Sequence, residues 1–345
     1  MKRLKSPLAT LLLAAAAAMA IPAVAQDIGY ATSQPLQLPH DTFFGSAAGV
    51  ATNSKGNVFV YARNGEPTIT LGGSRAFAHG GSSLYEFAPD GKFIRQIGRQ
   101  VYGFLAAQQV RVDKNDNIWV VDSYSSMVMK FAPDGRQIML LGRKPESVDV
   151  PSSPDTGRGN PPGSGAQSDL FQSPTDVAWD SAGNIFVADG IGNARVAKFT
   201  RDGVFVKSWG SRGTADGQFK IVHGIAVDAG GNVYVADRGN NRIQVFDNDG
   251  NFKSSIASGG DPAAICITPG AHQYLFSSNS NPSNDLDKGG EIYKLELNGT
   301  VVGKFGQGGK GPRDFGTVTG IDCRNPNSLY VAEFGNWRVT KVDLH

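Results

Sequence analysis

Residues 223–257 read HGIAVDAGGNVYVADRGNNRIQVFDNDGNFKSSIA, and this stretch decides the fold. Apolar side chains recur at every second position in VYVAD and IQVFD, which predicts β-strands and not a helix. The turns AGGN and NDG separate the strands, because glycine and asparagine tolerate the positive φ angles of tight hairpins. The stretch therefore predicts a unit of four short strands.

The same pattern recurs along the chain. Clear copies are QVRVDKNDNIWVVDSYSSMVMKFAPDGRQIMLLG at 109–142 and TDVAWDSAGNIFVADGIGNARVAKFTRDGVFVKSWG at 175–210. Weaker copies occupy 49–67 with 84–98, 263–281 with 291–306, and 319–345. A four-stranded unit repeated in this way predicts an all-β fold, a six-bladed β-propeller of four-stranded blades.

The repeats define the domain organisation. They run from 49 to 345, and the last copy ends after three strands. We expect residues 26–48, in particular the part around 30–38, to supply the missing outer strand and close the ring, which would cover an exposed sheet edge. Residues 143–170 are rich in Pro, Gly and Ser, and we expect them to form a flexible loop between two blades.

Residues 1–25 have the pattern of a secretory signal peptide. A basic start is followed by an apolar run from 8 to 19 and by the small-residue site Ala23-Val24-Ala25. Cleavage near Ala25-Gln26 predicts a periplasmic or extracellular protein. No later stretch reaches the roughly 18 apolar residues that a membrane helix needs.

The charge of the chain argues against two classes of partner. Three of its 33 basic residues lie in the predicted signal, so that 30 remain against 31 acidic residues, a net charge of −1. A nearly neutral protein has no electrostatic basis for binding nucleic acid or an anionic membrane.

The chain has two cysteines, Cys266 and Cys323. Alignment of the repeats places them on opposite faces of neighbouring strands, which argues against a disulfide. We therefore expect both to be small buried hydrophobic residues.

The segment ADRGNNRIQVFDNDG, residues 236–250, resembles the consensus of the NHL repeat. This resemblance implies NHL-type blades in which an acidic residue at the end of the second strand pairs with an arginine in the third strand. Three such structural pairs are expected: Asp189 with Arg195, Asp237 with Arg242, and Glu333 with Arg338.

Long insertions all fall in loops that a propeller places on one face. They are residues 64–83, 143–170 and 279–290. Loops of this length in a compact fold are often binding loops, so this face is the predicted functional face.

The predicted site is a polar mouth where the first and second strands open on this face. Arg63, Tyr124 and His223 lack a partner within their repeat and are the candidate catalytic residues. The candidate ligand-binding residues are Gln108, Thr175, Arg238, Asn279 and Thr319.

Within NHL propellers, the chain resembles the peptidyl-α-hydroxyglycine α-amidating lyases. The resemblance implies a zinc ion held by three histidines, in a reaction that releases a peptide amide and glyoxylate. Arg63 matches the catalytic arginine of that group and His223 one zinc ligand. Gln108 and Thr319 occupy the other two ligand positions, and Ile191 replaces the tyrosine. One ligand of three does not hold zinc.

Three functions remain open. The leading hypothesis is a monomeric propeller that binds a small molecule, peptide or glycan at its mouth, without an assigned cofactor. The second is a metal-dependent lyase or lactonase-like hydrolase, with zinc bound at His223 or with calcium; the available calcium ligands are Asp189, Asn279 and Glu333. The third is a protein–protein scaffold.

Overall fold

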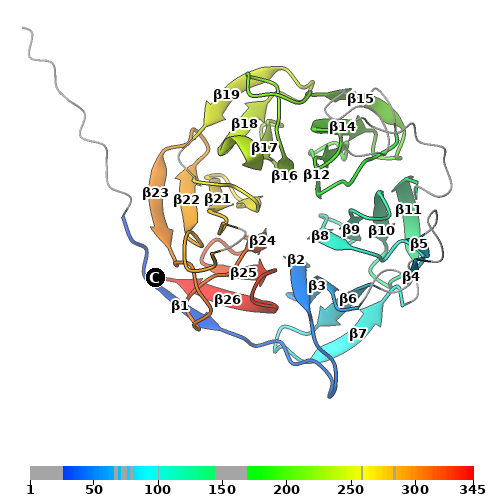
Figure 1. Ribbon diagram of the computed structural model, residues 1–345, viewed down its shortest axis with the longest axis vertical. Coiled ribbons are helices and arrows are strands. Elements are labelled where there is room, and N and C mark those ends of the chain that lie inside the picture. The colour runs from blue at the N-terminus through cyan, green and yellow to red at the C-terminus, as the bar shows by residue number, and fades with distance from the viewer. Residues whose placement is uncertain are drawn as a thin grey trace, which may run out of the picture.

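The computed structural model describes residues 26–65, 69–70, 76–77, 81–99, 101–143, 169–257, 259–282 and 285–345. Six four-stranded antiparallel sheets stand around a central axis (Figure 1). This arrangement confirms the predicted all-β, six-bladed propeller. The expected signal peptide and most of the 143–170 loop lie outside the described residues. Within the described ranges, no helix has the length and apolar character needed to cross a membrane.

Each blade runs from an innermost to an outermost strand. Blade 1 consists of β2 (Ser46–Thr52), β3 (Val58–Arg63), β6 (Ser82–Phe87) and β7 (Phe93–Ile97). Blade 2 consists of β8 (Ala107–Val112), β9 (Ile118–Asp122), β10 (Met127–Phe131) and β11 (Gln137–Gly142). Blade 3 consists of β12 (Asp176–Trp179), β13 (Ile185–Asp189), β14 (Arg195–Phe199) and β15 (Phe205–Trp209). Blade 4 consists of β16 (Val222–Val227), β17 (Val233–Asp237), β18 (Arg242–Phe246) and β19 (Phe252–Ile256). Blade 5 consists of β20 (Ile265–Ile267), β21 (Tyr274–Ser278), β22 (Ile292–Glu296) and β23 (Val301–Phe305). Blade 6 is β24 (Val318–Asp322), β25 (Ser328–Glu333), β26 (Arg338–Leu344) and β1 (Tyr30–Ser33). The short pair β4 (Ile69–Thr70) and β5 (Ala76–Phe77) and the 3₁₀ turn η2 (Arg238–Asn240) complete the described elements.

The N-terminal segment completes the sixth blade and fastens its neighbours. Strand β1 pairs antiparallel with β26 and supplies the fourth strand that the last sequence repeat lacks (Figure 1). Before β1, the Ile28 N–H donates to the Lys304 carbonyl in blade 5. After β1, the Gln37 N–H donates to the Gly91 carbonyl in blade 1. One segment therefore bonds to three consecutive blades.

The core lies between the blades. Six clusters of buried apolar side chains fill the gaps, and each draws on two consecutive blades. In the gap between blades 1 and 2, the ring centroids of Tyr61 and Phe104 are 5.0 Å apart, and those of Phe104 and Phe131 are 5.9 Å apart. Side chains of one blade thus face those of the next, and the hydrophobic effect holds the ring together across these gaps.

The innermost strands approach one another so closely that some positions require glycine. A Cβ atom on Gly49 would lie 2.5 Å from the backbone nitrogen of Val110 in the next blade. One on Gly320 would lie 3.0 Å from the Cα of Gly49. The alternation of strand residues is therefore interrupted by glycine where the ring is narrowest.

The three predicted acid–arginine pairs are confirmed. The Nε···O distances are 2.8 Å for Arg195 with Asp189, 2.9 Å for Arg242 with Asp237, and 2.8 Å for Arg338 with Glu333. Each arginine also donates to backbone carbonyls of the connection that enters its own blade. These pairs fix the connections between blades, which is a structural role.

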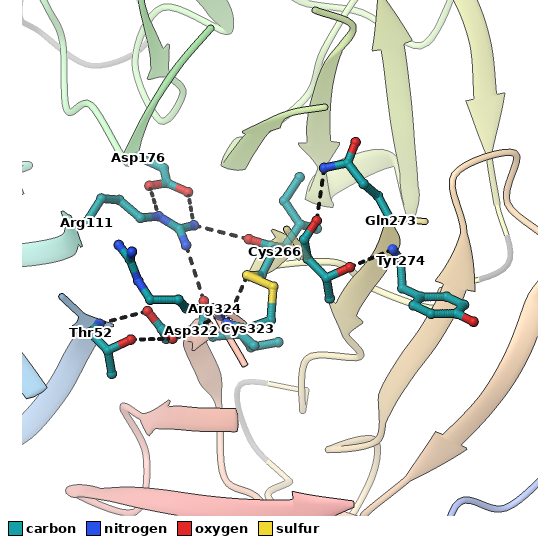
Figure 2. The surroundings of a disulfide bond; sticks show 12 residues. Thr52, Arg111, Asp176, Cys266, Gln273, Tyr274, Asp322, Cys323 and Arg324 are labelled. Carbon is teal, nitrogen blue, oxygen red and sulfur yellow. Dashed lines mark hydrogen bonds and ion pairs between the residues drawn. A yellow bond between two sulfur atoms is a disulfide. The ribbon is translucent and has the colours of Figure 1, made fainter. Parts of the chain in front are cut away.

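A buried ion pair crosses the channel below the mouth. Arg111 of β8 makes two parallel hydrogen bonds to Asp176 of β12, at 2.9 and 2.6 Å (Figure 2). Its guanidinium also donates to the carbonyls of Ile265 and Ile321, in blades 5 and 6. Asp176 in turn accepts the Ile225 N–H of blade 4. This one pair therefore joins five of the six blades across the axis.

Cys266 and Cys323 form a disulfide, with their Cα atoms 6.0 Å apart (Figure 2). The expectation of two unpaired cysteines was wrong. Neighbouring blades stack face against face, so side chains on opposite faces of two neighbouring inner strands point toward each other. Opposite faces are therefore the arrangement that a bridge between blades 5 and 6 requires.

Replacing Asp176 with asparagine should leave the Arg111 charge buried without its counterion. Loss of one partner of a buried pair destabilises a protein by about 3 kcal/mol or more. We expect a loss of this size in the free energy of unfolding, measured by guanidinium denaturation. The control is Asp202→Asn, because the Asp202–Arg201 pair is exposed and should be worth less than about 0.5 kcal/mol. Equal losses in the two variants would contradict the assigned role of Arg111 and Asp176.

Removing the disulfide by the double change Cys266→Ser and Cys323→Ser should lower the free energy of unfolding by about 2–4 kcal/mol, because the bridge closes a loop of 57 residues. Guanidinium denaturation of the wild type with reductant should match the variant. If the reductant leaves the wild-type midpoint unchanged while thiol titration shows complete reduction, the bridge contributes nothing to stability.

Candidate functional site

β-Bulges interrupt four of the innermost strands near the predicted mouth of the channel. The ladder between β8 and β9 skips Gln108, the ladder between β2 and β3 skips Ala48, and that between β24 and β25 skips Thr319. In blade 4, the interruption falls at His223 and Gly224. A bulge re-aims a side chain out of the regular alternation, and bulges are frequent next to binding sites.

A chain of hydrogen bonds links three of the predicted site residues. The Arg63 Nη2 donates to the Gln108 Oε1 at 2.9 Å, and its Nε donates to the Ala107 carbonyl at 2.8 Å. The Gln108 Nε2 lies 3.1 Å from the His223 Nε2. The His223 Nδ1 lies 3.0 Å from the Ala263 carbonyl oxygen. The chain thus runs across blades 1, 2, 4 and 5.

The direction of each bond fixes the protonation of His223. A guanidinium only donates, so the Gln108 oxygen faces Arg63 and its NH₂ group faces the imidazole. The His223 Nε2 must then accept, while Nδ1 donates to the Ala263 carbonyl. His223 is therefore the neutral Nδ1–H tautomer.

The electrostatic surroundings of His223 favour the same state. Burial lowers its pKa to about 4, and the nearby positive charges of Arg238 and Arg63 act in the same direction. A ring that is neutral near pH 7, with both nitrogens engaged, positions its neighbours. It is not an available acid.

Arg63 stands where other blades carry a carboxylate. It ends β3, at the position of Asp122, Asp189, Asp237 and Glu333 in the other second strands. Among the described residues, no carboxylate lies within ion-pair distance of its guanidinium, which sits 5.0 Å from the centre of the Phe334 ring. Burial lowers the Arg63 pKa from its usual value, and the nearby Asp122 carboxylate offsets part of this effect. The predicted mouth thus contains a half-buried cation that has no carboxylate at ion-pair distance within the described part of the chain.

The other carboxylates near the mouth are occupied. The buried Asp122 accepts hydrogen bonds from the Tyr61 hydroxyl and from the backbone N–H groups of Leu105, Ala106 and Ser125. Asp189, Asp237 and Glu333 hold their arginines, as described above. Asp189, Glu333 and Asn279 are therefore not gathered into the calcium cluster considered from the sequence.

The remaining predicted ligand-binding side chains mostly bond to their own scaffold. The Thr175 hydroxyl donates to the His223 carbonyl at 2.7 Å, and the Thr319 hydroxyl to the Ala48 carbonyl at 2.9 Å. Asn279 donates to the Glu291 carboxylate at 2.7 Å. Arg238 pairs with Asp261 at 3.3 Å and remains partly exposed.

Tyr124 is not joined to this group. Its ring is 46% exposed in the loop after β9, and only its backbone N–H, which donates to Asp122, enters the hydrogen bonds recorded for the described residues. Its role as a catalytic residue stays a prediction.

The residues present do not fit the zinc site that the resemblance implies. The His223 lone pair at Nε2 accepts from Gln108, whose carbonyl oxygen is held by Arg63, and the Thr319 hydroxyl bonds to the backbone. A metal would need three anionic or imidazole ligands here. In the described ranges, no three His, Cys, Asp or Glu side chains converge as a metal site would require.

Two residues of the mouth were not found from the sequence. The Phe334 ring packs against the Arg63 guanidinium, and Asp261 forms an ion pair with Arg238. Both lie in loops, where periodicity gives no signal. The residue after each second-strand acid is a position that faces the mouth, and Phe334 could have been found by that rule.

Comparison with known proteins agrees with this architecture. The NHL repeat family matches residues 219–246, within blade 4. The chain is 30% identical to peptidyl-alpha-hydroxyglycine alpha-amidating lyase 1 of Drosophila melanogaster over 266 residues, which is 69% of this chain and 44% of the relative. It is 31% identical to peptidyl-glycine alpha-amidating monooxygenase A of Xenopus laevis over 225 residues, 62% of this chain and 22% of that protein. The chain thus spans less than half of either relative.

Solved structures share the fold. A streptogramin B lyase superposes with a TM-score of 0.56 over 92% of this chain and 98% of its own, at 13% identity. A structural genomics protein of Bacteroides thetaiotaomicron gives a TM-score of 0.59 over 92% of this chain and 77% of its own, at 12% identity. The chain is an NHL-repeat six-bladed β-propeller that resembles the amidating lyases and lacks most of their zinc ligands.

The low pKa of His223 should make stability fall in mild acid. In the unfolded chain a histidine takes up a proton near pH 6.5, whereas in the folded protein it does so only near pH 4. The contribution of neutral His223 to the free energy of unfolding is therefore complete above pH 6.5 and is lost as the pH falls toward 4. Denaturation of the wild type should show a loss between pH 7 and 4.5 that exceeds the loss in His223→Gln by roughly 2 kcal/mol. An identical pH dependence in both proteins would show that His223 has the same pKa in the folded and unfolded states.

Proposed function

We propose that this chain is an exported binding propeller whose mouth holds a small molecule or peptide through a carboxylate at Arg63. The observation that carries this proposal is the charge of that side chain. Among the described residues, no carboxylate forms an ion pair with this half-buried guanidinium, and Asp122, which lies beyond ion-pair distance, offsets only part of the cost of desolvation. A bound carboxylate would supply the counterion and could accept two hydrogen bonds from the planar fork of the arginine.

The surroundings of Arg63 support a preformed site. Its Nε and one Nη2 proton are used by Ala107 and Gln108, which fix the orientation of the guanidinium. Phe334 packs against its face.

Export is supported by the disulfide. Such bridges persist in oxidising compartments and are rare in the cytosol. The Cys266–Cys323 bond is therefore consistent with the predicted signal peptide and with a periplasmic or extracellular protein.

A lyase of the amidating type is the second candidate, since the Drosophila relative bears that name and Arg63 and His223 share one hydrogen-bonded chain. The occupied lone pair of His223 weighs against it. Release of glyoxylate from an α-hydroxyglycine peptide, with and without added zinc, tests this candidate directly.

Arg63→Gln should weaken the binding of carboxylates. The probe is acetyl-triglycine, with its C-terminal amide as the neutral counterpart, in calorimetric titrations. We expect the acid to bind more tightly than the amide, and Arg63→Gln to weaken acid binding by about tenfold or more, because hydrogen bonds to charged groups contribute about 1.5–3 kcal/mol. The control Arg136→Gln removes an exposed charge from the edge of blade 2. If the acid and amide bind equally well, Arg63 does not bind a carboxylate.

A further inference from the structure

A cavity of about 280 Å³ opens between the N-terminal segment and the loop that joins β25 to β26. The segment between β1 and β2 runs from the edge of the ring to the innermost strand of blade 1 (Figure 1). The lining is mostly apolar, from Leu36, Leu38, Phe43, Phe44, Trp337 and Val339. The cavity therefore lies at the junction of blades 6 and 1, on the face that carries the mouth.

Trp337 occupies a backbone position that disfavours large residues. Its φ angle is 56°, in the left-handed region. The equivalent residues of blades 2, 3 and 4 have nearly the same φ angle, and they are Ser126, Ala194 and Asn241. A bulky residue is unusual at such a position. Trp337 thus departs from the small residues of three sister blades.

The described part of the chain leaves most of the Trp337 side chain uncovered. Its side chain is 68% exposed, and Phe43, which lines the same cavity, is 78% exposed. Both rings leave apolar surface in water, which is unfavourable unless a ligand covers it. Strained positions of this kind gather at functional sites.

The polar groups of the cavity favour an apolar occupant over a sugar. Arg338 is the charged residue in the described lining, and its guanidinium is held by Glu333 and by the carbonyls of Lys310, Gly311 and Asp314. Gln34 and Thr42 are the other polar side chains of the lining, against six apolar ones, so an aliphatic or aromatic side chain fits the cavity better than a glycan does.

The cavity adjoins the cation of the mouth. Gly45 belongs to the lining and packs so closely that a Cβ atom there would lie 2.0 Å from the Arg63 carbonyl oxygen. Phe334, which lies 5.0 Å from the Arg63 guanidinium, belongs to the same loop as Trp337. Gly45 and the loop of Phe334 and Trp337 therefore connect the apolar cavity to Arg63.

We infer that this cavity is the subsite for an aromatic or aliphatic side chain of a peptide ligand whose terminal carboxylate lies at Arg63. The inference rests on the proposed function, because it assumes that Arg63 binds the carboxylate. The positive charge of Arg63 favours the C-terminal end of the peptide, which carries a carboxylate. The cavity favours an apolar residue within a few positions of that end.

The test compares acetyl-tetraglycine with its four variants that carry one phenylalanine each, by calorimetric titration. At least one phenylalanine peptide should bind about tenfold more tightly than tetraglycine, since burying such a side chain contributes about 1.5–3 kcal/mol. Trp337→Ala should remove that gain and leave tetraglycine binding unchanged, and Phe43→Ala should reduce it. Both side chains are exposed, so neither variant should affect folding.

The control is Val204→Ala, which shortens an exposed apolar side chain on blade 3. Equal binding of all five peptides would overturn the subsite and leave the carboxylate site intact. A phenylalanine gain that Trp337→Ala preserves would also overturn it. Sedimentation adds one more outcome: a wild-type dimer that Trp337→Ala dissociates would mean that a second copy of the chain covers these rings.

Discussion

The ion pair of Arg111 and Asp176 is the contact on which the centre of the propeller depends. A ring of blades leaves polar backbone groups of its innermost strands facing a narrow channel, and each such group needs a partner. Arg111 supplies donors to carbonyls of two blades, and Asp176 accepts from a third. The pair therefore satisfies polar backbone groups of three blades at the centre of the ring.

The site arises from small departures of single blades from a common plan. Most second strands end in an aspartate or glutamate that holds the connection entering the blade, but the second strand of blade 1 ends in Arg63. The bulge residue of blade 2 is Gln108, which has a donor and an acceptor and can therefore bridge a cation and a neutral imidazole. The fold is common to all blades, whereas the chemistry comes from the positions where one blade differs.

The sequence predicted what lies within one repeat. The strands and the turns follow from the order of residues inside a single blade, and the resemblance to the NHL repeat implied the pairs such as Asp237 with Arg242. The first-strand positions of Gln108 and His223 also predicted that both would face the mouth. The hydrogen bond between them joins two blades and could not be predicted from the repeat pattern.

Contacts between repeats were not predictable in this way. The partners of Arg111 lie in three other blades, and the Cys266–Cys323 bridge depends on how one blade stacks upon the next. No role for Trp337 was predicted from the sequence. Its exposure follows from a backbone angle that the spacing of apolar residues does not reveal.

The sixth blade has a consequence for the order of folding. Tyr30 pairs with Leu344, so this sheet joins residues from nearly opposite ends of the chain. Loop-closure entropy grows with the logarithm of the loop length, and closing this loop costs about 3 kcal/mol more than closing one of ten residues. The other blades are local hairpin units and can assemble first. Cys266 and Cys323 come together when blade 6 packs on blade 5, which does not require β1, so oxidation of the thiols can anchor three strands of the last blade before the ring closes.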